Sequence, residues 1–363
     1  MRRILHFMAD VKIGSGMATV VMNYYRHIDR SRVQFDFLCF EDGSLTYAQE
    51  IESLGGRVFY IPRPRLLSME DIRDFFHEHQ GEFWVLHCHP IWSAAVLGPI
   101  AKRYGARAVF LHSHSEKPGE SKVSILRNRL MLYSSAKKVD VCLACSNVAA
   151  KVLNRYTSTV YILPNAIDTH AFLFDSAVRQ SSRRQLGIAP QTHVIGHVGR
   201  MVDVKNQDFL LRAFALYCMV EPAAQLLLIG SGPLDEKLHT LASELGIENN
   251  VRFMGACRNI AQLYAAMDVF VMPSLYEGLS MALLEAQAAG LPCVISDTIS
   301  AEADITGHIY RLPIDQPQIW ADTLIKVLNM PKKRTYGIEE AFNRKKLDIY
   351  TVVQELITLY ERI

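Results

Sequence analysis

The sequence predicts an α/β protein built from two domains, each with a parallel β-sheet. The chain has 363 residues, which is more than one ordinary hydrophobic core holds. Apolar, strand-length runs alternate with helical patterns along it, as they do in parallel sheets whose strands are joined by helices. The alternation stops at a polar stretch, residues 175–187, and then starts again. We therefore expect two Rossmann-like domains, with this stretch as the link between them.

The expected elements follow from apolar runs for strands and apolar residues at helical spacing for helices. In the first half, strands are expected at residues 4–9, 33–40, 58–61, 83–89, 106–112, 139–144 and 160–163, and helices at 17–27, 69–79 and 93–104. In the second half, strands are expected at 193–198, 225–229, 251–254, 268–272 and 293–296, and helices at 208–219, 234–245, 260–265, 280–289 and 338–362. The domains should span residues 1–170 and 171–340, followed by a C-terminal helix over 341–363.

The composition argues against several classes of protein. A net charge of +2 gives no basis for a nucleic-acid partner. The apolar runs are strand-length and interrupted, so no transmembrane helix is expected. The run near the start ends at Asp10, too early for a signal peptide, and should be the first strand. Seven cysteines, mostly in apolar segments, suit a reducing cytoplasm, and the C-x-x-C pair Cys142 and Cys145 falls in an expected strand rather than a redox motif.

One segment, residues 272–286, carries two acids, Glu277 and Glu285, with seven residues between them. An apolar run before it predicts a buried strand, and a helix should start after Ser280, a residue type that caps helices. Glu277 should therefore lie at the carboxyl edge of a sheet, where open α/β folds bind ligands. Glu285 falls inside an apolar helix, where a carboxylate needs a partner. A loop acid plus a paired core acid is the structural alternative.

The backbone between the two acids also suits an anion. Gly278 allows the chain to turn tightly. The N–H groups of Leu279, Ser280 and Met281 stand at a helix start, where they can bind a phosphate.

A second segment combines two cations with a helix start. Arg200 follows a predicted strand that ends at Gly199, and Lys205 precedes a helix that opens at Gln207. Arginine offers a planar fork of donors and lysine a mobile point charge, and together they suit a diphosphate. The helix dipole favours an anion at the same place. Two solvated loop cations are the alternative explanation.

Two glycine-rich turns do not match the common nucleotide motifs. The turn at residues 14–16 opens a helix, but a dinucleotide fingerprint needs a further glycine where Thr19 stands. The turn at residues 230–233 lacks the Gly-Lys-Ser/Thr of a P-loop. The sequence therefore indicates neither a dehydrogenase nor a P-loop nucleotidase.

Histidines follow two predicted strands of the first half. His87 and His89 share one strand face, a geometry that suits a metal, but no carboxylate or further thiol stands nearby to complete a site. We therefore expect no metal there. His112 ends the next strand, and it is either a ligand-binding residue or a surface loop histidine.

The segment with Glu277 and Glu285 resembles the E-x7-E signature of retaining glycosyltransferases with the GT-B fold, family 4 above all. The resemblance covers nearly the whole chain and is strongest over residues 196–304. It implies two Rossmann-like domains that face a central cleft, with a C-terminal helix that crosses back onto the first domain. The first domain would bind the acceptor and the second the nucleotide sugar. By resemblance, Glu277 meets the donor sugar and Glu285 holds the ribose.

The same resemblance assigns the remaining site residues. Arg200 and Lys205 would bind the donor diphosphate, and Gly16 would approach it from the first domain, although Ser15 stands where a second glycine is usual. Met254 would face the nucleotide base and His112 the transferred sugar. The implied catalytic residues are His112, Arg200, Lys205 and Glu277, and the implied donor-binding residues are Gly16, Gly199, Arg200, Lys205, Met254, Glu277, Gly278, Leu279, Ser280 and Glu285.

The resemblance also implies a reaction. A hexose or N-acetylhexosamine would pass from a nucleoside-diphosphate sugar, most often a UDP-sugar in this family, with retention through front-face departure and attack. The chain contains no Asp-x-Asp, so we expect no metal cofactor, and the cations would stabilise the leaving diphosphate instead. Residues 301–306 resemble a variant of bacterial capsular and exopolysaccharide transferases, which favours a lipid-linked saccharide acceptor.

A basic segment, residues 117–138, interleaves cations with apolar residues at helical spacing. Helices of this kind lie on anionic membrane leaflets, which would make a cytoplasmic protein peripheral on the inner face of the membrane. The alternative is a solvated helix that packs its apolar side on its own sheet.

Two rival functions remain open from the sequence. A nucleotide-sugar epimerase has the same two-domain shape but lacks the E-x7-E pattern, so the sugar products would distinguish it. A catalytically silent partner of another transferase would not hydrolyse the donor, and the intact set of Arg200, Lys205, Glu277 and Glu285 argues against it.

Overall fold

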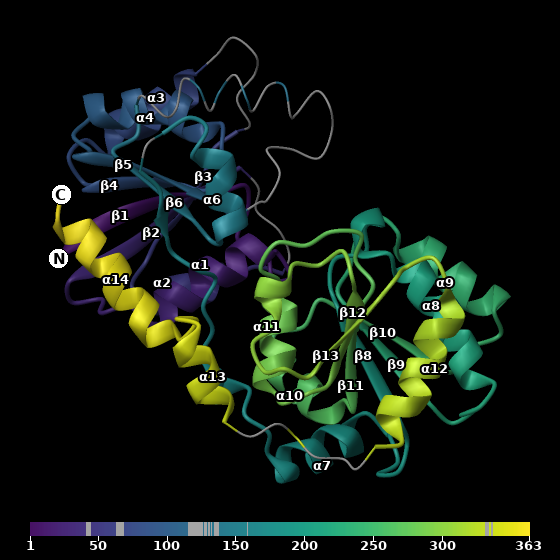
Figure 1. Cartoon of the computed structure of the whole chain (residues 1–363). Coiled ribbons are helices and arrows are strands. Elements are labelled where there is room, and N and C mark those ends of the chain that lie inside the picture. Colours follow the sequence, from purple (N-terminus) through teal and green to yellow (C-terminus); the bar gives the residue numbers. More distant parts are fainter. Residues whose placement is uncertain are drawn as a thin grey trace. The chain divides into compact units, whose positions relative to one another are not determined.

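The computed structural model describes residues 1–40, 45–62, 69–114, 126, 129, 131, 133, 138–157, 159–330, 334 and 337–363. Most of the basic segment 117–138 therefore lies outside the described residues. The chain forms two compact units, unit 1 (Met1–Ala166 with Ile349–Ile363) and unit 2 (Ile167–Asp348) (Figure 1). No helix among the described residues is long and apolar enough to cross a membrane.

Unit 1 contains a seven-stranded sheet in the order β3-β2-β1-β4-β5-β6-β7, with all neighbours parallel. Helices α3, α4 and α6 pack on one face, and α1 and α14 cover the other. Because β4 pairs with β1 on the side opposite β2, the strand order reverses between β1 and β4. The elements are β1 (Arg2–Phe7), α1 (Gly16–His27), β2 (Val33–Cys39), α2 (Ala48–Ser53), β3 (Val58–Tyr60), α3 (Glu70–Glu78), β4 (Val85–Cys88), α4 (Ser93–Arg103), β5 (Ala108–Ser113), β6 (Val141–Ala144), α6 (Asn147–Leu153), β7 (Tyr161–Ile162) and α14 (Ile349–Glu361).

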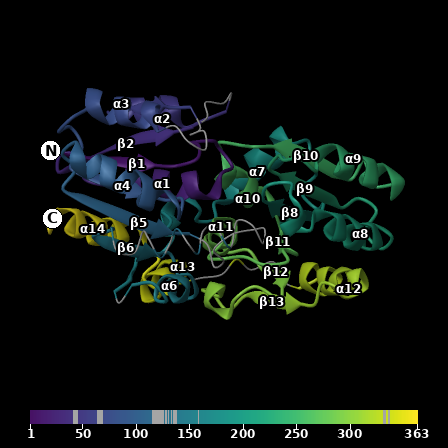
Figure 2. The same ribbon diagram turned by 90° about the horizontal axis from the view of Figure 1, so that it is seen from above.

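Unit 2 contains a six-stranded parallel sheet in the order β10-β9-β8-β11-β12-β13, which Figure 2 shows from one edge to the other. Helices α8, α9 and α12 lie along one face and α10 and α11 along the other (Figure 1). The order reverses between β8 and β11. The elements are η1 (Thr169–Ala171), α7 (Ser176–Gln185), β8 (Val194–Val198), η2 (Asp203–Lys205), α8 (Gln207–Cys218), β9 (Gln225–Ile229), α9 (Asp235–Glu244), β10 (Val251–Gly255), α10 (Ile260–Ala266), β11 (Val269–Met272), α11 (Met281–Ala288), β12 (Cys293–Ser296), η3 (Ala301–Ala303), β13 (Ile309–Leu312), α12 (Pro317–Leu328) and α13 (Ile338–Arg344).

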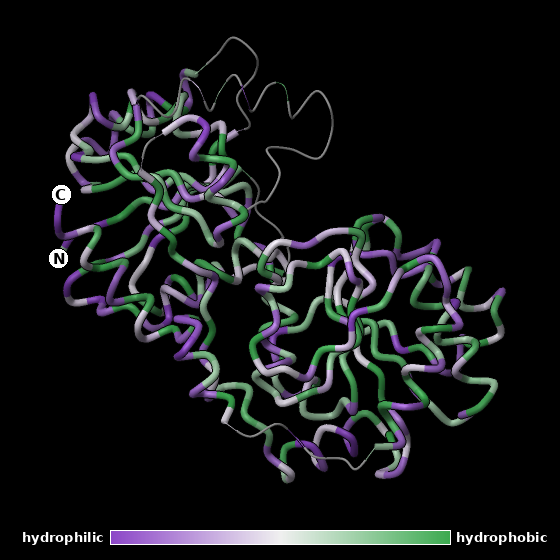
Figure 3. The backbone as a smooth tube through the Cα atoms, in the orientation of Figure 1, coloured by the Kyte–Doolittle hydropathy of each residue, from purple (hydrophilic) through white to green (hydrophobic). Residues whose placement is uncertain are grey.

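Hydrophobic residues gather along the strands at the centre of each unit (Figure 3). All four residues of β11 and all four of β12 are buried. Strands of this kind are covered by helices on both faces, so they appear in sequence as continuous apolar runs rather than alternating ones. This property explains why the strand positions could be predicted from the sequence, and the α/β fold is confirmed.

The C-terminal region differs from the expected single helix over 338–362. It consists of α13, which belongs to unit 2, and α14, which belongs to unit 1. Between them Lys346 adopts a left-handed conformation with φ 55°, and the N–H of Leu347 donates to the carbonyl of Phe342. That turn ends α13, so residues 341–348 lie in unit 2 and the chain returns to unit 1 at Ile349.

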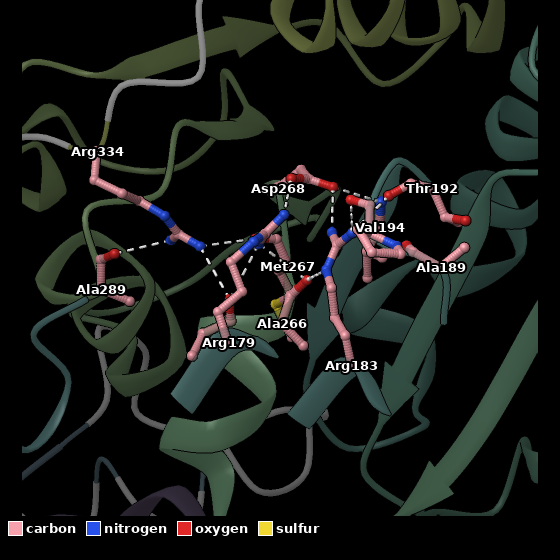
Figure 4. Close-up of polar contacts among 12 residues, drawn as sticks. Arg179, Arg183, Ala189, Thr192, Val194, Ala266, Met267, Asp268, Ala289 and Arg334 are labelled. Atoms are coloured by element: carbon pink, nitrogen blue, oxygen red, sulfur yellow. Dashed lines mark hydrogen bonds and ion pairs between the residues drawn. The ribbon is translucent and has the colours of Figure 1, made fainter. Parts of the chain in front are cut away.

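The prediction of an interdomain link at residues 175–187 was wrong, because this stretch forms α7 within unit 2. Asp175 caps the helix by accepting hydrogen bonds from two backbone N–H groups of its first turn. Two arginines of α7, Arg179 and Arg183, both form ion pairs with Asp268 at 2.6 Å (Figure 4). Arg334 joins them from a distant part of the chain. The polar composition that suggested a linker in fact supplies a buried network.

Candidate active site

The loops that follow β8 and β11 meet at the carboxyl edge of the unit 2 sheet. These two strands are neighbours, and the strand order reverses between them. The backbone N–H of Leu275 donates to the carbonyl of Val204 at 2.9 Å, and the Asn206 side chain donates to the carbonyl of Pro273 at 3.2 Å. Asn206 adopts a left-handed conformation, which asparagine tolerates better than most residues. Open α/β sheets bind their ligands at such a reversal.

An ion pair joins the two predicted parts of the site. Lys205 Nζ lies 2.5 Å from Glu277 Oε1, and both side chains are largely buried, with 17% and 12% of their surfaces exposed. The two residues come from different loops, separated by the whole of α8 to β11. The sequence predicted each residue separately and did not predict that they pair.

Arg200 stands beside this pair but is organised differently. It is exposed, and within the part of the chain that the structure describes its guanidinium makes no hydrogen bond or ion pair. The first turn of α8 begins at Gln207, close after it in the chain. The N–H groups of that turn, the helix dipole and the guanidinium together form a positively polarised edge.

Two buried side chains hold the Arg200 loop in place. His197 Nδ1 lies 2.9 Å from the carbonyl of Val271, so this nitrogen carries the proton and Nε2 accepts from Gln207 Nε2 at 3.3 Å. The same Gln207 nitrogen donates to the carbonyl of Arg200 at 2.8 Å. Burial lowers the pKa of His197 to about 4, so the imidazole is neutral. Both residues stand inside the predicted cation segment, and only the tertiary contacts give them this function.

The glycine turn at residues 230–233 supports the same loop from β9. A Cβ on Gly230 would lie 2.1 Å from the carbonyl oxygen of Gly199, and one on Gly232 would lie 2.4 Å from that of Met201. The N–H of Met201 donates to the carbonyl of Ser231, and that of Leu234 to the carbonyl of Met201. The glycines are therefore required for close backbone packing, in line with the absence of a P-loop motif.

Helix α11 begins after Ser280, as predicted, and its first residue is Met281. Ser280 occupies the N-cap position, although its side chain makes no capping hydrogen bond. Gly278 does not adopt a positive φ, so the expected tight turn does not depend on left-handed backbone there. Leu279 is partly buried against the apolar cluster beneath α11.

Glu285 lies within α11 and is 6% exposed. Its Oε2 accepts a hydrogen bond from the hydroxyl of Tyr264 at 3.0 Å, and the carbonyl of Ala282 lies 3.1 Å from the same hydroxyl. Burial, with the neighbouring carboxylate, raises the pKa of Tyr264 well above its usual value, so the phenol stays protonated and can donate. The predicted need for a partner is thus met by a tyrosine on α10. No pattern in the sequence pointed to it.

Met254 sits where the pairing of β10 with β9 is irregular. The register shifts between Phe253 and Gly255, so Met254 is skipped in the ladder. The N–H of Gly230 donates to the carbonyl of Gly255, which places this bulge beside the glycine turn at the carboxyl edge. The expected contact of Met254 with a nucleotide base stays a prediction.

Two predicted site residues belong to unit 1. Gly16 opens α1 in an exposed position, where an added Cβ would meet nothing within 4 Å among the described residues. The glycine with left-handed backbone in this turn is Gly14, with φ 88°. His112 lies inside β5 and is fully buried, with its ring stacked 6.5 Å from that of Tyr24. The partly exposed histidine at the end of β5 is His114.

Burial keeps both of these imidazoles neutral. It lowers the pKa of His114 to about 4 and lowers the pKa of His112 well below its usual value. The rings of the two residues lie 4.1 Å apart. The strand end that the sequence assigned to His112 is therefore occupied by His114, because β5 continues to Ser113.

Of the predicted residues, unit 2 brings together Gly199, Arg200, Lys205, Glu277 and the start of α11. Glu285 lies further along α11, and Met254 lies near the carboxyl end of β10. Sequence reasoning missed Ser274 as well as His197 and Gln207. The Oγ of Ser274 and the Oε1 of Gln207 are buried at this edge and meet no hydrogen-bond partner among the described residues. Buried polar atoms of this kind are commonly completed by a ligand or water.

Two family models match the chain, one over each half. The model described as Glycosyltransferase Family 4 matches residues 14–171, and the model described as Glycosyl transferases group 1 matches residues 178–344. EpsF of Bacillus subtilis (strain 168), provisionally named a glycosyltransferase, is 34% identical over 99% of this chain and 96% of its own length.

Two further proteins show the breadth of the similarity. A UDP-Gal:alpha-D-GlcNAc-diphosphoundecaprenol alpha-1,3-galactosyltransferase from Escherichia coli is 24% identical over 78% of this chain and 76% of its own. The crystal structure of HepE from Anabaena in complex with UDP-glucose shares the fold, with a TM-score of 0.82, 21% identity and 100% coverage of both chains. The full-length relative, the two family models and the shared architecture show that this chain belongs to the glycosyltransferases with the GT-B fold.

Proposed function

We propose that this glycosyltransferase moves a hexose or N-acetylhexosamine from a UDP-sugar to a lipid-linked saccharide in surface polysaccharide synthesis. The transfer retains the anomeric configuration and needs no divalent metal. The observation that carries the proposal is the contact of Lys205 with Glu277 at 2.5 Å. The cation assigned to the diphosphate and the acid assigned to the sugar are adjacent, as the two sides of the bond that breaks would require.

The charges at this edge suit a departing diphosphate. Arg200 and Lys205 carry two positive charges against the one negative charge of Glu277, and the first turns of α8 and α11 add unsatisfied N–H groups. Donors fixed before the reaction stabilise developing charge without reorganising at the moment of transfer. We expect the diphosphate to lie against Arg200 and Lys205, so that the fixed cations replace a bridging metal.

The nucleoside would extend away from this charged centre. The carboxylate of Glu285, oriented by Tyr264, supports a contact to ribose hydroxyls. The bulge at Met254 supports contacts to the base through backbone groups. On the unit 1 side, we assign the sugar contact of the predicted strand-end histidine to His114 rather than His112, because His112 is fully buried.

The donor and acceptor classes are supported by relatives. HepE was crystallised with UDP-glucose, and the galactosyltransferase of E. coli is named for UDP-Gal and for a diphosphoundecaprenol-linked GlcNAc acceptor. A lipid-linked acceptor would bring the enzyme to the inner face of the cytoplasmic membrane. Flotation of the purified chain with vesicles of anionic phospholipid, compared with vesicles of phosphatidylcholine, tests that location.

The function is tested with purified protein and a panel of UDP-sugars. We expect thermal stabilisation by UDP, slow hydrolysis of one UDP-sugar alone, and transfer to a GlcNAc-diphosphate-lipid acceptor, with an α-linkage in the NMR spectrum of the product. An epimerised UDP-sugar formed without acceptor would identify an epimerase. Binding of UDP with neither hydrolysis nor transfer from any donor would identify a silent subunit, and a β-linked product would overturn retention.

A further inference from the structure

Five histidines gather on one face of the unit 1 sheet, where the sequence had indicated only a pair. His6 stands on β1, His87 on β4 with His89 directly after it, and His112 on β5 with His114 directly after it. The parallel register places His6 opposite His87, and the next row brings His89 beside His112. The sequence-based argument against a metal, that no further ligand stood near His87 and His89, therefore fails in three dimensions.

Two sets of three imidazoles are close enough to share an ion. Ligand nitrogens of His6, His87 and His89 lie within 4.8 Å of one another, as do those of His89, His112 and His114. The three histidines of the first set are all buried. The second set includes the partly exposed His114, through which an ion can enter.

The central residue of the second set is poorly satisfied. Both ring nitrogens of His112 are buried and meet no hydrogen-bond partner of good geometry among the described residues, although the backbone of Leu163 is near enough to favour the protonated ring. A buried polar atom without a partner destabilises the fold, because its hydration is lost and nothing replaces it. Two such nitrogens on His112, beside the rings of His89 and His114, indicate an ion or water that completes them.

The two outer residues already have the support that metal ligands need. His89 Nε2 contacts His6 Nδ1 at 3.0 Å, and His114 Nδ1 lies 3.4 Å from Asn165 Oδ1. Ligating histidines usually bond through their second nitrogen to an oxygen or another polar group, which fixes the ring. The remaining nitrogens, His89 Nδ1 and His114 Nε2, face each other at 2.9 Å.

We propose that His89, His112 and His114 form a binding site for a divalent transition metal of the zinc class. Tetrahedral coordination with bonds of about 2.0–2.1 Å separates ligand nitrogens by roughly 3.4 Å. The three histidine nitrogens already lie within 4.8 Å of one another, so small side-chain movements would bring them to that separation. Neutral imidazoles favour Zn²⁺, Co²⁺ and Ni²⁺ over Mg²⁺ and Ca²⁺, which prefer oxygen ligands. His112 on β5, His114 directly after it and His89 directly after the neighbouring β4 supply three ligands, which leaves the fourth tetrahedral position for water or another ligand.

The site has a consequence that depends on the proposed function. A metal held by His114 removes that imidazole from the sugar, so Zn²⁺ inhibits transfer and a chelator restores it. Binding itself is independent of the transferase assignment, because it is measured without any substrate. The two proposals can therefore fail separately.

The test is equilibrium dialysis of the chelator-treated full chain against Zn²⁺, with Co²⁺ absorption as a probe of geometry. We expect one tightly bound ion per chain and an intense visible Co²⁺ band typical of tetrahedral coordination. His112→Phe, which fills the same buried space without ligand atoms, and His114→Gln should each weaken binding by more than about 100-fold. Asn165→Ala should weaken it by about 10–100-fold, as loss of an outer partner does.

The matched control is His170→Gln, which removes a histidine that is 61% exposed in unit 2 and should leave the tight site unchanged. Circular dichroism and thermal stabilisation by UDP verify that each variant is folded. If His112→Phe and His114→Gln keep the tight ion and the Co²⁺ band, or if the unaltered chain binds no ion tightly, the proposed site is wrong.

Discussion

A charged cluster lies at each end of strand β11, and each combines one acid with two or more basic residues. At its amino end, Asp268 meets Arg179 and Arg183 at 2.6 Å. At its carboxyl end, Glu277 meets Lys205 at 2.5 Å, with Arg200 nearby. Each cluster has more positive than negative charge. The two clusters differ in what accepts hydrogen bonds from the basic side chains that the single acid does not neutralise.

At the amino end the protein itself satisfies them. The guanidinium of Arg179 donates to the carbonyls of residues 265–267, and Arg334 donates to carbonyls of Ala265, Met267 and Ala289 (Figure 4). Three of these carbonyls end α10, where a helix dipole favours positive charge. Burial still lowers the pKa of Arg334 to about 9, with the neighbouring arginines adding to the effect.

At the carboxyl end the Arg200 guanidinium has no such partners among the described residues, while its backbone carbonyl is held by Gln207. A fixed backbone with an unsatisfied, solvent-facing cation is the arrangement expected of a ligand site. A cluster of basic residues therefore indicates a ligand site when the N–H donors of a basic side chain have no acceptor within the protein. Substitutions at each end of β11 test this contrast.

The largest effect is expected at the amino end. Asp268→Asn keeps the shape but removes the negative charge beside the buried Arg183 and the largely buried Arg179, and breaking such a pair costs about 3–5 kcal/mol. Urea denaturation monitored by circular dichroism should show this loss in the free energy of unfolding. Asp322→Asn, at an exposed position on α12, is the control and should change it little. Equal stability of the two variants would show that the cluster is not structural.

At the carboxyl end, the effect should appear in the reaction instead. Arg200→Ala or Lys205→Ala should lower kcat by about 10²–10³-fold, or about 2.7–4 kcal/mol, because each removes a charge aimed at the leaving diphosphate. For Arg200→Ala the thermal midpoint should stay near that of the unaltered chain. Arg212→Ala, an exposed arginine on α8, should turn over normally. Near-normal turnover by Arg200→Ala at saturating donor would contradict its assigned role in stabilising the leaving diphosphate.

Substitutions of the two acids should affect different steps, one UDP binding and the other turnover. Glu285→Gln should weaken UDP binding by about 1–3 kcal/mol, since it loses charge-assisted hydrogen bonds to the ribose. Glu277→Gln should bind UDP nearly as well while turning over more slowly at saturating donor. Calorimetry with UDP and steady-state kinetics on both variants separate these outcomes. The reverse pattern, with affinity lost only in Glu277→Gln, would exchange the two roles.

The smallest effect is expected from chelation. Because fixed cations take the place of a bridging ion, transfer should continue in EDTA at its initial rate, or faster where EDTA removes an inhibiting ion from His114. The measurement is the transfer rate before and after dialysis against EDTA, followed by addition of Mg²⁺ or Mn²⁺. Complete loss on chelation with recovery on adding either ion would contradict the metal-independent mechanism.

The contrast between two segments with charged residues shows how far structure could be predicted from the sequence. The segment around Glu277 was predicted well, because a buried strand, a loop and a helix start follow each other locally. Residues 175–187 were assigned to a linker because of their polar composition, yet they form α7. Nothing local reveals that Arg179 and Arg183 meet Asp268, which lies more than eighty residues away.

The α/β class, the two parallel sheets and the loops that carry the charges of the site all followed from the amino-acid sequence. These features depend on apolar runs, glycines and helix caps, which act within a few residues of one another. The pairing of Lys205 with Glu277, the support of Glu285 by Tyr264 and the gathering of five histidines on one sheet face emerged only in three dimensions. Each of these contacts joins segments that are far apart in the chain and that β-α-β connections bring side by side. No local sequence pattern specifies which distant residue will be the partner.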